Sequence, residues 1–348
     1  MSSAVVPVTR PLDHFSAAVD HQSRTAILAR NVTMNRSTRE ALSGFAWLLP
    51  ALVILVAFRV IPILLSVRMS LYDWGMAGAR AFVGLGNYVA VLRDPVFWQS
   101  LLNTGWYVLF EVPLILFISL FVAILLNQKI RGLGAYRTIY YLPVVTSIVA
   151  VSVVWRWLLQ PDRGLLNYIL SWFHISGIRW LQDPRGLFQL IAGPSVQLPP
   201  NLRGPSIALL SLVMMGIWKG IGYNVVIFLA GLQNIDKSYY EAARIDGAGR
   251  MAMFSRITWP LISPTTYYVL IMSCISAFET FAQVWIMTGP PAGGPLSSTK
   301  VVMYYFYETS FELWRLGYGA AIAFFAFFII LALTILQRVF LERRVQYG

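Results

Sequence analysis

Long apolar runs alternate with polar segments along the whole chain. Each run approaches the roughly 20 apolar residues that an α-helix needs to cross the hydrocarbon core of a membrane. We therefore predict an all-α membrane protein with six transmembrane helices. The predicted spans cover about residues 42–66, 101–126, 138–159, 205–232, 262–288 and 318–341.

The most specific polar segment is 233–261, between the fourth and fifth runs. Ser238 followed three residues later by Glu241 is a capping-box pattern, which predicts a helix of about two turns that begins there. Gly247 is the predicted C-terminal cap, because glycine tolerates the left-handed conformation that ends many helices. The helix carries two consecutive alanines, so a partner surface can approach its backbone closely. The segment is either a connector that lies against the chain's own helices or a docking surface for another protein.

A second short helix is predicted later in the same segment. Pro260 is expected to end it, because proline cannot continue a helical hydrogen-bond ladder. Ser263 and Pro264 then predict the N-cap and the first turn of the fifth span. The apolar side chains of the second helix recur at spacings of three and form one stripe, which consists of Met251, Phe254 and Ile257.

Composition supports the membrane assignment. Hydrophobic residues make up 57% of the chain and charged residues only 12%, about half of the charged fraction of a soluble domain. The net charge of +12 does not predict a nucleic-acid partner, because membrane proteins concentrate Lys and Arg in their cytoplasmic loops. The only cysteine, Cys274, excludes a disulfide within the chain.

The positive-inside rule sets the predicted orientation. With the N-terminus inside, the inner segments carry Lys and Arg more densely than the outer loops, so both termini and the 233–261 loop are expected to be cytoplasmic. Residues 1–41 lack an apolar core segment, and we interpret them as a disordered cytoplasmic tail rather than a signal peptide. A transmembrane domain over 42–344 and a short tail at 345–348 complete the predicted organisation.

Enzyme chemistry has no motif in this sequence. The chain contains no P-loop, no H-E-x-x-H and no G-x-S-x-G, and it has only three histidines. We therefore expect no ATP hydrolysis, no metal site and no cofactor in this chain.

Ionisable residues within the spans are candidates for function, because an unpaired charge in lipid is costly. Arg59 and Arg156 are close enough to a span end to reach the interface, which favours a structural role. Glu111 pairs with one of these arginines or has a functional role, and the sequence leaves both possibilities open. The full set is Arg59, Glu111, Arg156, Lys219 and Glu279.

Two polar stripes lie on the spans that flank the 233–261 loop. One consists of Gly216, Lys219, Gly220 and Tyr223 on the fourth span, at spacings that share one helix face. The other, on the fifth span beside Glu279, consists of Ser273, Ser276, Thr280 and Gln283. Small and hydroxyl residues also serve helix packing in membranes. The combination of Lys, Glu, Tyr, Thr and Gln favours a polar cavity suited to hydroxyl-rich solutes.

The 233–261 loop resembles the EAA loop of permease subunits in binding-protein-dependent ABC importers. The matching residues are Glu241, Ala242, Ala243, Gly247, Ile257 and Pro260. Asp246-Gly247-Ala248 and Pro264 make the match similar to the carbohydrate branch, which includes maltose and glycerol-3-phosphate permeases. Further matching stretches are GLGNY at 84–88, Arg137 with YYLPVV at 140–145, WKGIGYN at 218–224, FLAGLQNI at 228–235 and WIMTGP at 285–290.

The resemblance implies the six-helix type I importer permease fold, in the cytoplasmic membrane of a bacterium or archaeon. It implies a second homologous permease, two cytoplasmic ATPase subunits that hold ATP and Mg, and an extracytoplasmic binding protein. The solute would be a sugar, oligosaccharide, polyol or glycerophosphate, moved by alternating access. The residues implied to couple to the ATPase are Glu241, Ala242, Ala243, Asp246 and Gly247. Those implied to line the solute path are Gly216, Lys219, Gly220, Tyr223, Ser273, Ala277 and Thr280, and Glu279 is added because it flanks their stripe.

Three departures from the family pattern stand out. Lys219 places a charge where a neutral side chain would suit a neutral sugar, Trp259 replaces a leucine, and 190–204 resembles an insertion. The alternative function is an ion- or proton-coupled secondary transporter that acts alone through Glu111, Lys219 and Glu279.

Overall fold

The structure is a computed structural model that is almost entirely helical. The chain divides into two compact units, residues 1–65 and 66–348. The predicted disordered tail falls mainly outside the described residues, and so does the 345–348 tail. The described residues are 36–128, 132–175, 177–193, 196–199, 202–289 and 293–341.

The first unit contains α2 (Arg36–Leu55), the π-helical turn η1 (Val56–Val60) and the beginning of α3 (Ile61–Ser70). Together they form a helical stretch, Glu40–Ser70, that is long and apolar enough to cross a membrane. Pro62 follows the π-turn and has no N–H to donate, so the wider turn before it is the local adjustment that proline requires. Since α2 begins at Arg36, helix replaces the predicted disorder over 36–41.

Three long helices of the second unit correspond to the second, fourth and sixth predicted spans. They are α5 (Pro95–Leu126), α10 (Ile207–Gln233) and α17 (Leu316–Leu341), and each is long and apolar enough to cross a membrane. The Asp94 carboxylate accepts the Val96 N–H at the start of α5, and the Ser206 hydroxyl accepts the Leu209 N–H at the start of α10. Both are side-chain N-caps, which fix where these helices begin.

The third predicted span is broken. Helices α6 (Leu133–Val145) and α7 (Ile148–Leu158) meet at an angle of 98°, so the prediction of one helix over 138–159 is wrong. Thr146 and Ser147 between them have extended backbone conformations. Pro143 removes one donor from the last turn of α6, and the Thr146 hydroxyl donates to the Pro143 carbonyl.

The fifth predicted span is also interrupted. Helices α12 (Arg250–Met253), η3 (Phe254–Thr258) and α13 (Trp259–Leu261) form one helical stretch, bent by 63° from α14 (Ser263–Phe278). A second break at Glu279–Phe281 separates α14 from α15 (Ala282–Thr288), so a single helix over 262–288 was the wrong prediction. Pro260 does not end the second helix of the loop, because the π-turn η3 before it accommodates the proline as η1 accommodates Pro62. Ser263 is the first residue of α14 rather than its N-cap.

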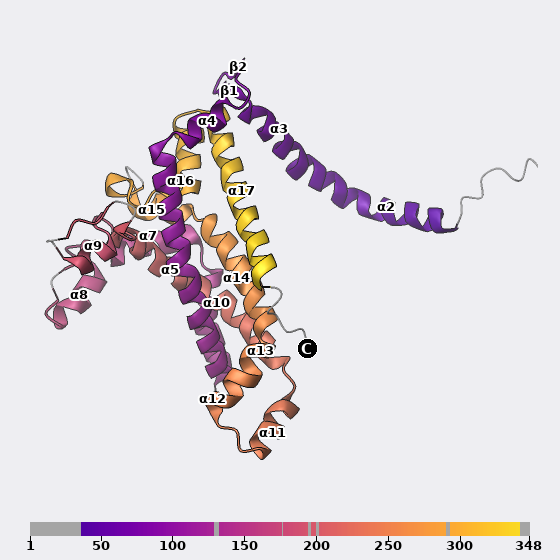
Figure 1. Ribbon diagram of the computed structural model, residues 1–348, viewed down its shortest axis with the longest axis vertical. Helices are drawn as coiled ribbons and strands as arrows, with labels where there is room; N and C mark the ends of the chain where they lie inside the picture. Colours follow the sequence, from indigo (N-terminus) through magenta and orange to yellow (C-terminus); the bar gives the residue numbers. More distant parts are fainter. Residues whose placement is uncertain are drawn as a thin grey trace, which may run out of the picture. The chain divides into compact units, whose positions relative to one another are not determined.

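The described residues thus contain four helices of membrane-spanning length, or up to six if each bent pair counts as one span. In Figure 1, the hairpin of β1 (Tyr72–Gly75) and β2 (Gly78–Phe82) lies with α4 (Gly86–Leu92) at one end of the second unit. Helix α11 (Lys237–Ile245) lies at the opposite end. The shorter elements are α8 (Leu165–Trp172), α9 (Leu187–Ala192), η4 (Pro295–Ser297), α16 (Val302–Tyr307) and η5 (Glu308–Glu312).

The core of the second unit is built around α5 and α10. One buried cluster contains Tyr107, Leu209 and Met215, and another, farther along the same two helices, contains Ala123 and Phe228. Both helices are therefore buried along one side over most of their length, and they form the rigid framework on which the other elements pack.

Asp94 connects the start of α5 to α16 and α17. Besides capping α5, its carboxylate accepts hydrogen bonds from the Tyr305 and Tyr318 hydroxyls. Burial alone would raise the pKa of Asp94, but the bonds from the two tyrosines and from the backbone outweigh it, and the pKa lies below its ordinary value of 3.8.

We expect Asp94→Ala to lower the free energy of unfolding by about 1 to 2 kcal/mol, the usual cost of losing an N-cap. Thermal unfolding of the purified protein, followed by circular dichroism, measures this. Because the folded pKa is lowered, the contribution is complete above pH 3.8 and is lost only as the pH falls below it. The loss should therefore be the same at about pH 6 and about pH 8. Asp162→Ala, at an exposed position, is the control, and equal destabilisation by both changes would contradict the role of Asp94.

Candidate functional site

A polar cavity of about 580 Å³ lies between α5, α10 and α14, and the α6–α7 break and the α14–α15 break border it. Its size falls in the usual range for small-molecule sites. Irregular backbone at membrane depth is tolerated where it lines a cavity, and interrupted helices often build binding sites there. The lining residues are Glu111, Ile115, Ile148, Gly216, Lys219, Gly220, Tyr223, Asn224, Met272, Ser273, Ser276, Glu279, Thr280, Phe281, Ala282 and Gln283.

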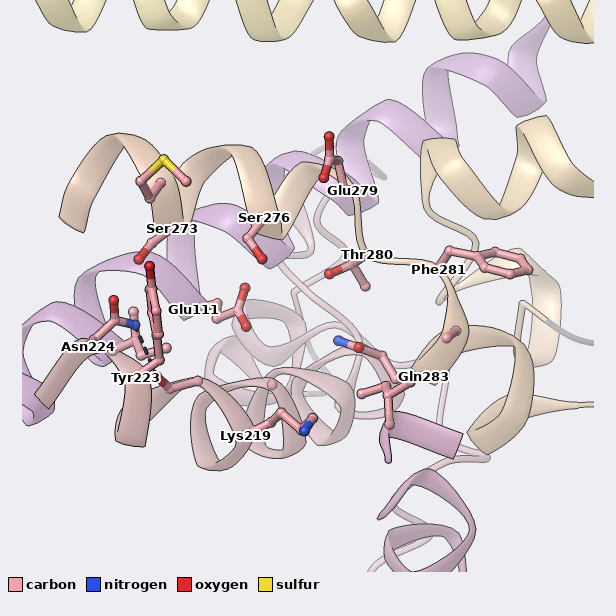
Figure 2. A pocket seen from close by; sticks show the side chains of 16 residues that line it. Glu111, Lys219, Tyr223, Asn224, Ser273, Ser276, Glu279, Thr280, Phe281 and Gln283 are labelled. Atoms are coloured by element: carbon pink, nitrogen blue, oxygen red, sulfur yellow. Dashed lines mark hydrogen bonds between the residues drawn. The ribbon is translucent and has the colours of Figure 1, made fainter. Parts of the chain in front are cut away.

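The two predicted stripes face each other across this cavity. Figure 2 shows Ser273 and Ser276 of α14 opposite Lys219 and Tyr223 of α10, with the Glu111 carboxylate of α5 between them. All residues predicted for the solute path line the cavity except Ala277, which is buried in the adjoining core. Sequence reasoning left out the lining residues Ile115, Ile148, Asn224, Met272, Phe281 and Ala282, and it did not assign Glu111 to the path.

Glu111 obtains its hydrogen bond from its own helix. The Tyr107 hydroxyl lies 3.1 Å from the Glu111 Oε1, and the Gln283 Nε2 donates to the Tyr107 hydroxyl at 2.7 Å. Arg156 instead donates to the Ile286 carbonyl, so a Glu111–Arg156 ion pair is not formed. The i, i+4 spacing of Tyr107 and Glu111 was the sequence signal that could have identified this pair.

Two glycines of α10 make room for α5. A Cβ on Gly216 would lie 2.3 Å from the Tyr107 hydroxyl and 2.4 Å from the Glu111 Oε1. A Cβ on Gly220 would lie 2.4 Å from the Ile115 Cδ1. All three distances are shorter than a real Cβ shows. Glycine at these positions therefore permits α10 to pack closely on α5 while Glu111 keeps its place at the cavity.

The ammonium group of Lys219 donates hydrogen bonds to the backbone at the α6–α7 break. Its Nζ lies 2.7 Å from the Pro143 and Thr146 carbonyl oxygens and 3.4 Å from that of Val144. An ammonium has three N–H donors, and these three carbonyls account for all of them. The lysine thus lines the cavity mainly with its aliphatic stem.

The other ionisable side chains at the cavity are two carboxyl groups. Glu111 and Glu279 present carboxylates, which only accept hydrogen bonds when ionised. The neutral polar groups around them can donate or accept. The arrangement therefore suits a molecule rich in hydroxyl donors and disfavours an anion. No group of acidic, histidine and cysteine side chains able to hold a metal ion occurs among the described residues.

The segment between α10 and α14 presents α11 at one end of the second unit (Figure 1). Asp236, not Ser238, caps α11: its carboxylate accepts the Ser238 N–H at 2.8 Å, so the N-cap lies two residues before the predicted one. Glu241 and Ala242 are exposed and Ala243 is half-buried. Exposed apolar side chains, among them Ile245 with 86% of its surface accessible, make this face suitable for contact with another protein.

The end of α11 has the geometry predicted for it. Gly247 has a φ of +74°, its N–H donates to the Arg244 carbonyl, and the Ala248 N–H donates to the Ala243 carbonyl. These two bonds define a Schellman motif. The Tyr240 hydroxyl also bonds to the Thr258 hydroxyl at 2.9 Å, which holds α11 against η3.

Comparison with known proteins agrees with this geometry. The family model described as "Binding-protein-dependent transport system inner membrane component" matches residues 24–347. The chain is 33% identical to the lactose transport system permease protein LacF of Rhizobium radiobacter, over 85% of this chain and 92% of that protein. It is 35% identical to the sn-glycerol-3-phosphate transport system permease protein UgpA of Agrobacterium fabrum, over 77% and 83%.

A third relative is the trehalose/maltose transport system permease protein MalF of Thermococcus litoralis, 30% identical over 88% of this chain and 95% of that protein. Among solved structures, a chain of a bacterial alginate ABC transporter, in complex with its alginate pentasaccharide-bound periplasmic protein, superimposes with a TM-score of 0.70. That match covers 90% of this chain and 98% of the other at 23% identity, so it shows a shared fold.

Proposed function

The chain belongs to the family of binding-protein-dependent transport system inner membrane components, and we propose that, as an ABC importer permease subunit, it forms half of the path for a neutral, hydroxyl-rich solute. Sugars, oligosaccharides and polyols have this chemistry. Membership of this family does not favour a secondary transporter that acts alone.

The observation that carries the solute class is the charge of the cavity. The ammonium of Lys219 donates to backbone carbonyls, which leaves the carboxyl groups of Glu111 and Glu279 as the ionisable groups available to a solute. The charge at Lys219 is therefore compatible with a neutral sugar. The lactose and trehalose/maltose permeases among the relatives are named for neutral sugars, whereas the glycerol-3-phosphate permease is named for an anion. The cavity favours a neutral sugar over an anion.

The importer that we propose contains other subunits besides this chain. A second homologous permease supplies the other half of the path. Two cytoplasmic ATPases, which hold ATP and Mg, dock on α11 through Glu241, Ala242, Ala243, Asp246 and Gly247. A binding protein delivers the solute to the opposite face. The chain crosses the cytoplasmic membrane of a bacterium or archaeon six times, if each bent pair counts as one span, with both termini inside.

The energy of ATP reaches the cavity through one helix. Helix α10 carries the Gly216–Tyr223 stripe and ends at Gln233, and Asp236 already caps α11. A displacement of α11 by a closing ATPase dimer therefore moves α10, and with it one wall of the cavity. This coupling supports alternating access, in which the cavity faces one side of the membrane at a time.

The solute class is testable by equilibrium binding to the assembled transporter in detergent without the binding protein, so that the preference of the binding protein does not enter. The probes are radiolabelled maltose, lactose, trehalose and glycerol-3-phosphate. We expect a neutral sugar to bind, and Glu111→Ala to weaken it about tenfold or more, the usual effect of losing a hydrogen bond to a charged group. Binding of glycerol-3-phosphate at least as tightly as any of the sugars would contradict the proposal.

A further inference from the structure

The break between α6 and α7 leaves carbonyl groups that need donors. The last four carbonyls of an α-helix have no partner within the helix. In α6 these include the carbonyls of Pro143 and Val144, and the Thr146 carbonyl follows in extended chain. The Thr146 hydroxyl donates to the Pro143 carbonyl, but each carbonyl oxygen has two lone pairs, and those of Val144 and Thr146 still need donors.

Lys219 supplies those donors from a different helix. Its ammonium contacts all three carbonyls, and its positive charge lies at the negative end of the α6 dipole. The interaction is reinforced one turn away on α10, where a Cβ on Gly222 would lie 2.2 Å from the Tyr140 carbonyl oxygen. The backbones of α6 and α10 therefore approach closely at Gly222, and the Lys219 side chain bonds α10 to the end of α6.

Helix α7, on the other side of the break, packs on a different helix from α6. Helix α7 packs on α15, and the Arg156 Nη1 of α7 lies 3.4 Å from the Ile286 carbonyl of α15. The first half of the broken span is thus fastened to α10 and the second half to α15. Ile148 at the start of α7 and Gln283 at the start of α15 both line the cavity. A movement of α10 relative to α15 has to change the bend, and with it the shape of the cavity.

We propose that Lys219 is a positioning residue that fastens the α6–α7 break to α10, so that displacement of α11 is converted into a change of the cavity wall. The proposal rests on the proposed function, because it requires α11 to be the point at which an ATPase acts. It assigns to Lys219 a role in coupling ATP hydrolysis to transport rather than a contact with the solute.

Substitutions of Lys219 separate the two roles. Methionine has similar length and no donors, glutamine has two donors and no charge, and arginine keeps both charge and donors. In proteoliposomes that contain the complete importer, we expect Lys219→Met to lower the solute imported per ATP about tenfold or more. The solute concentration for half-maximal uptake should stay within about twofold of wild type. Lys219→Arg should keep most of the coupling and Lys219→Gln should be intermediate. Val226→Ala, on the same helix but outside the cavity, is the control.

A spectroscopic measurement reports the geometry of the α6–α7 break and does not require transport. Nitroxide labels at Ile139 on α6 and Trp157 on α7, both exposed, report the distance across the bend once Cys274 is replaced by serine. We expect a narrow distance distribution with Lys219 or Lys219→Arg, and a broad one with Lys219→Met.

The outcomes distinguish this proposal from the proposed function. An unchanged distance distribution in Lys219→Met overturns the fastening role, whatever happens to uptake. A raised half-saturating solute concentration with unchanged import per ATP also overturns it, because Lys219 would then contact the solute. A distribution that broadens in Lys219→Met, in an assembly that imports no sugar even with Lys219 present, supports the fastening role and contradicts the proposed function instead.

Discussion

Gly216→Ala is expected to reduce solute uptake at least about tenfold while the transporter still assembles. The new Cβ would lie 2.3 Å from the Tyr107 hydroxyl and 2.4 Å from the Glu111 Oε1. The Tyr107 side chain has little room to move, because it is fully buried and its hydroxyl also accepts a hydrogen bond from Gln283. The methyl group therefore has to displace Glu111 or separate α10 from α5, and either change alters the cavity.

A matched control is available on the partner helix. Gly105 lies within α5, and a Cβ there would have nothing within 4 Å, so Gly105→Ala should leave uptake near wild type. Adding Tyr107→Phe to Gly216→Ala removes one of the two clashing atoms and should restore uptake in part. Uptake is measured with labelled sugar in proteoliposomes that contain the whole assembly. If Gly216→Ala transports as well as Gly105→Ala, the cavity is not on the solute path.

The stripe on α10 was predictable because that segment is a regular helix. Gly216, Lys219, Gly220 and Tyr223 lie at i, i+3, i+4 and i+7, and on a continuous helix this spacing fixes a common face. Only the neighbours of that face, which are α5 and the cavity, had to come from the structure. The other stripe does not share one helix face as predicted, because Ser273 and Ser276 lie on α14, Thr280 lies in the break after it and Gln283 lies on α15.

The two breaks were not predictable in the same way. An apolar run has the same composition whether its helix is continuous or bent, so hydropathy detected the spans over 138–159 and 262–288 and missed their interruptions. The role of Lys219 could not be predicted from the sequence for a related reason. Its carbonyl partners lie on a different helix, distant in sequence, and backbone acceptors leave no mark in the residue pattern. The charge at 219 therefore looked like a solute contact until the fold showed where the ammonium points.

The ends of α11 show a third case, in which local signals compete. Asp236 and Ser238 are both good N-cap residues, and the structure uses Asp236, two residues before the N-cap predicted from the capping-box spacing. The other end had no such competitor. Gly247 is the first glycine after the helix, and it has the left-handed conformation that was predicted for it.

Gly247→Pro is expected to abolish uptake and to uncouple ATP hydrolysis from the solute, while the membrane helices remain inserted. Gly247 has a φ of +74°, whereas proline is restricted to about −65° and has no N–H. The substitution therefore removes the bond to the Arg244 carbonyl and excludes the conformation that allows Ala248 to bond to Ala243. The C-terminal end of α11 should unwind, and the docking face for the ATPase should lose its shape.

Glu241→Lys tests the same surface without changing the backbone. Its side chain is exposed on α11, so reversing its charge should disturb contact with a partner and leave the fold of this chain intact. Gly249→Ala is the control for Gly247→Pro, because Gly249 has a φ of −74° and a Cβ there would meet nothing within 4 Å. ATPase activity and sugar uptake are measured together in the reconstituted assembly, and circular dichroism checks that the helical content is kept. Wild-type uptake in Glu241→Lys would mean that α11 does not transmit the energy of ATP, and the path through α10 to Lys219 would then have no source of motion.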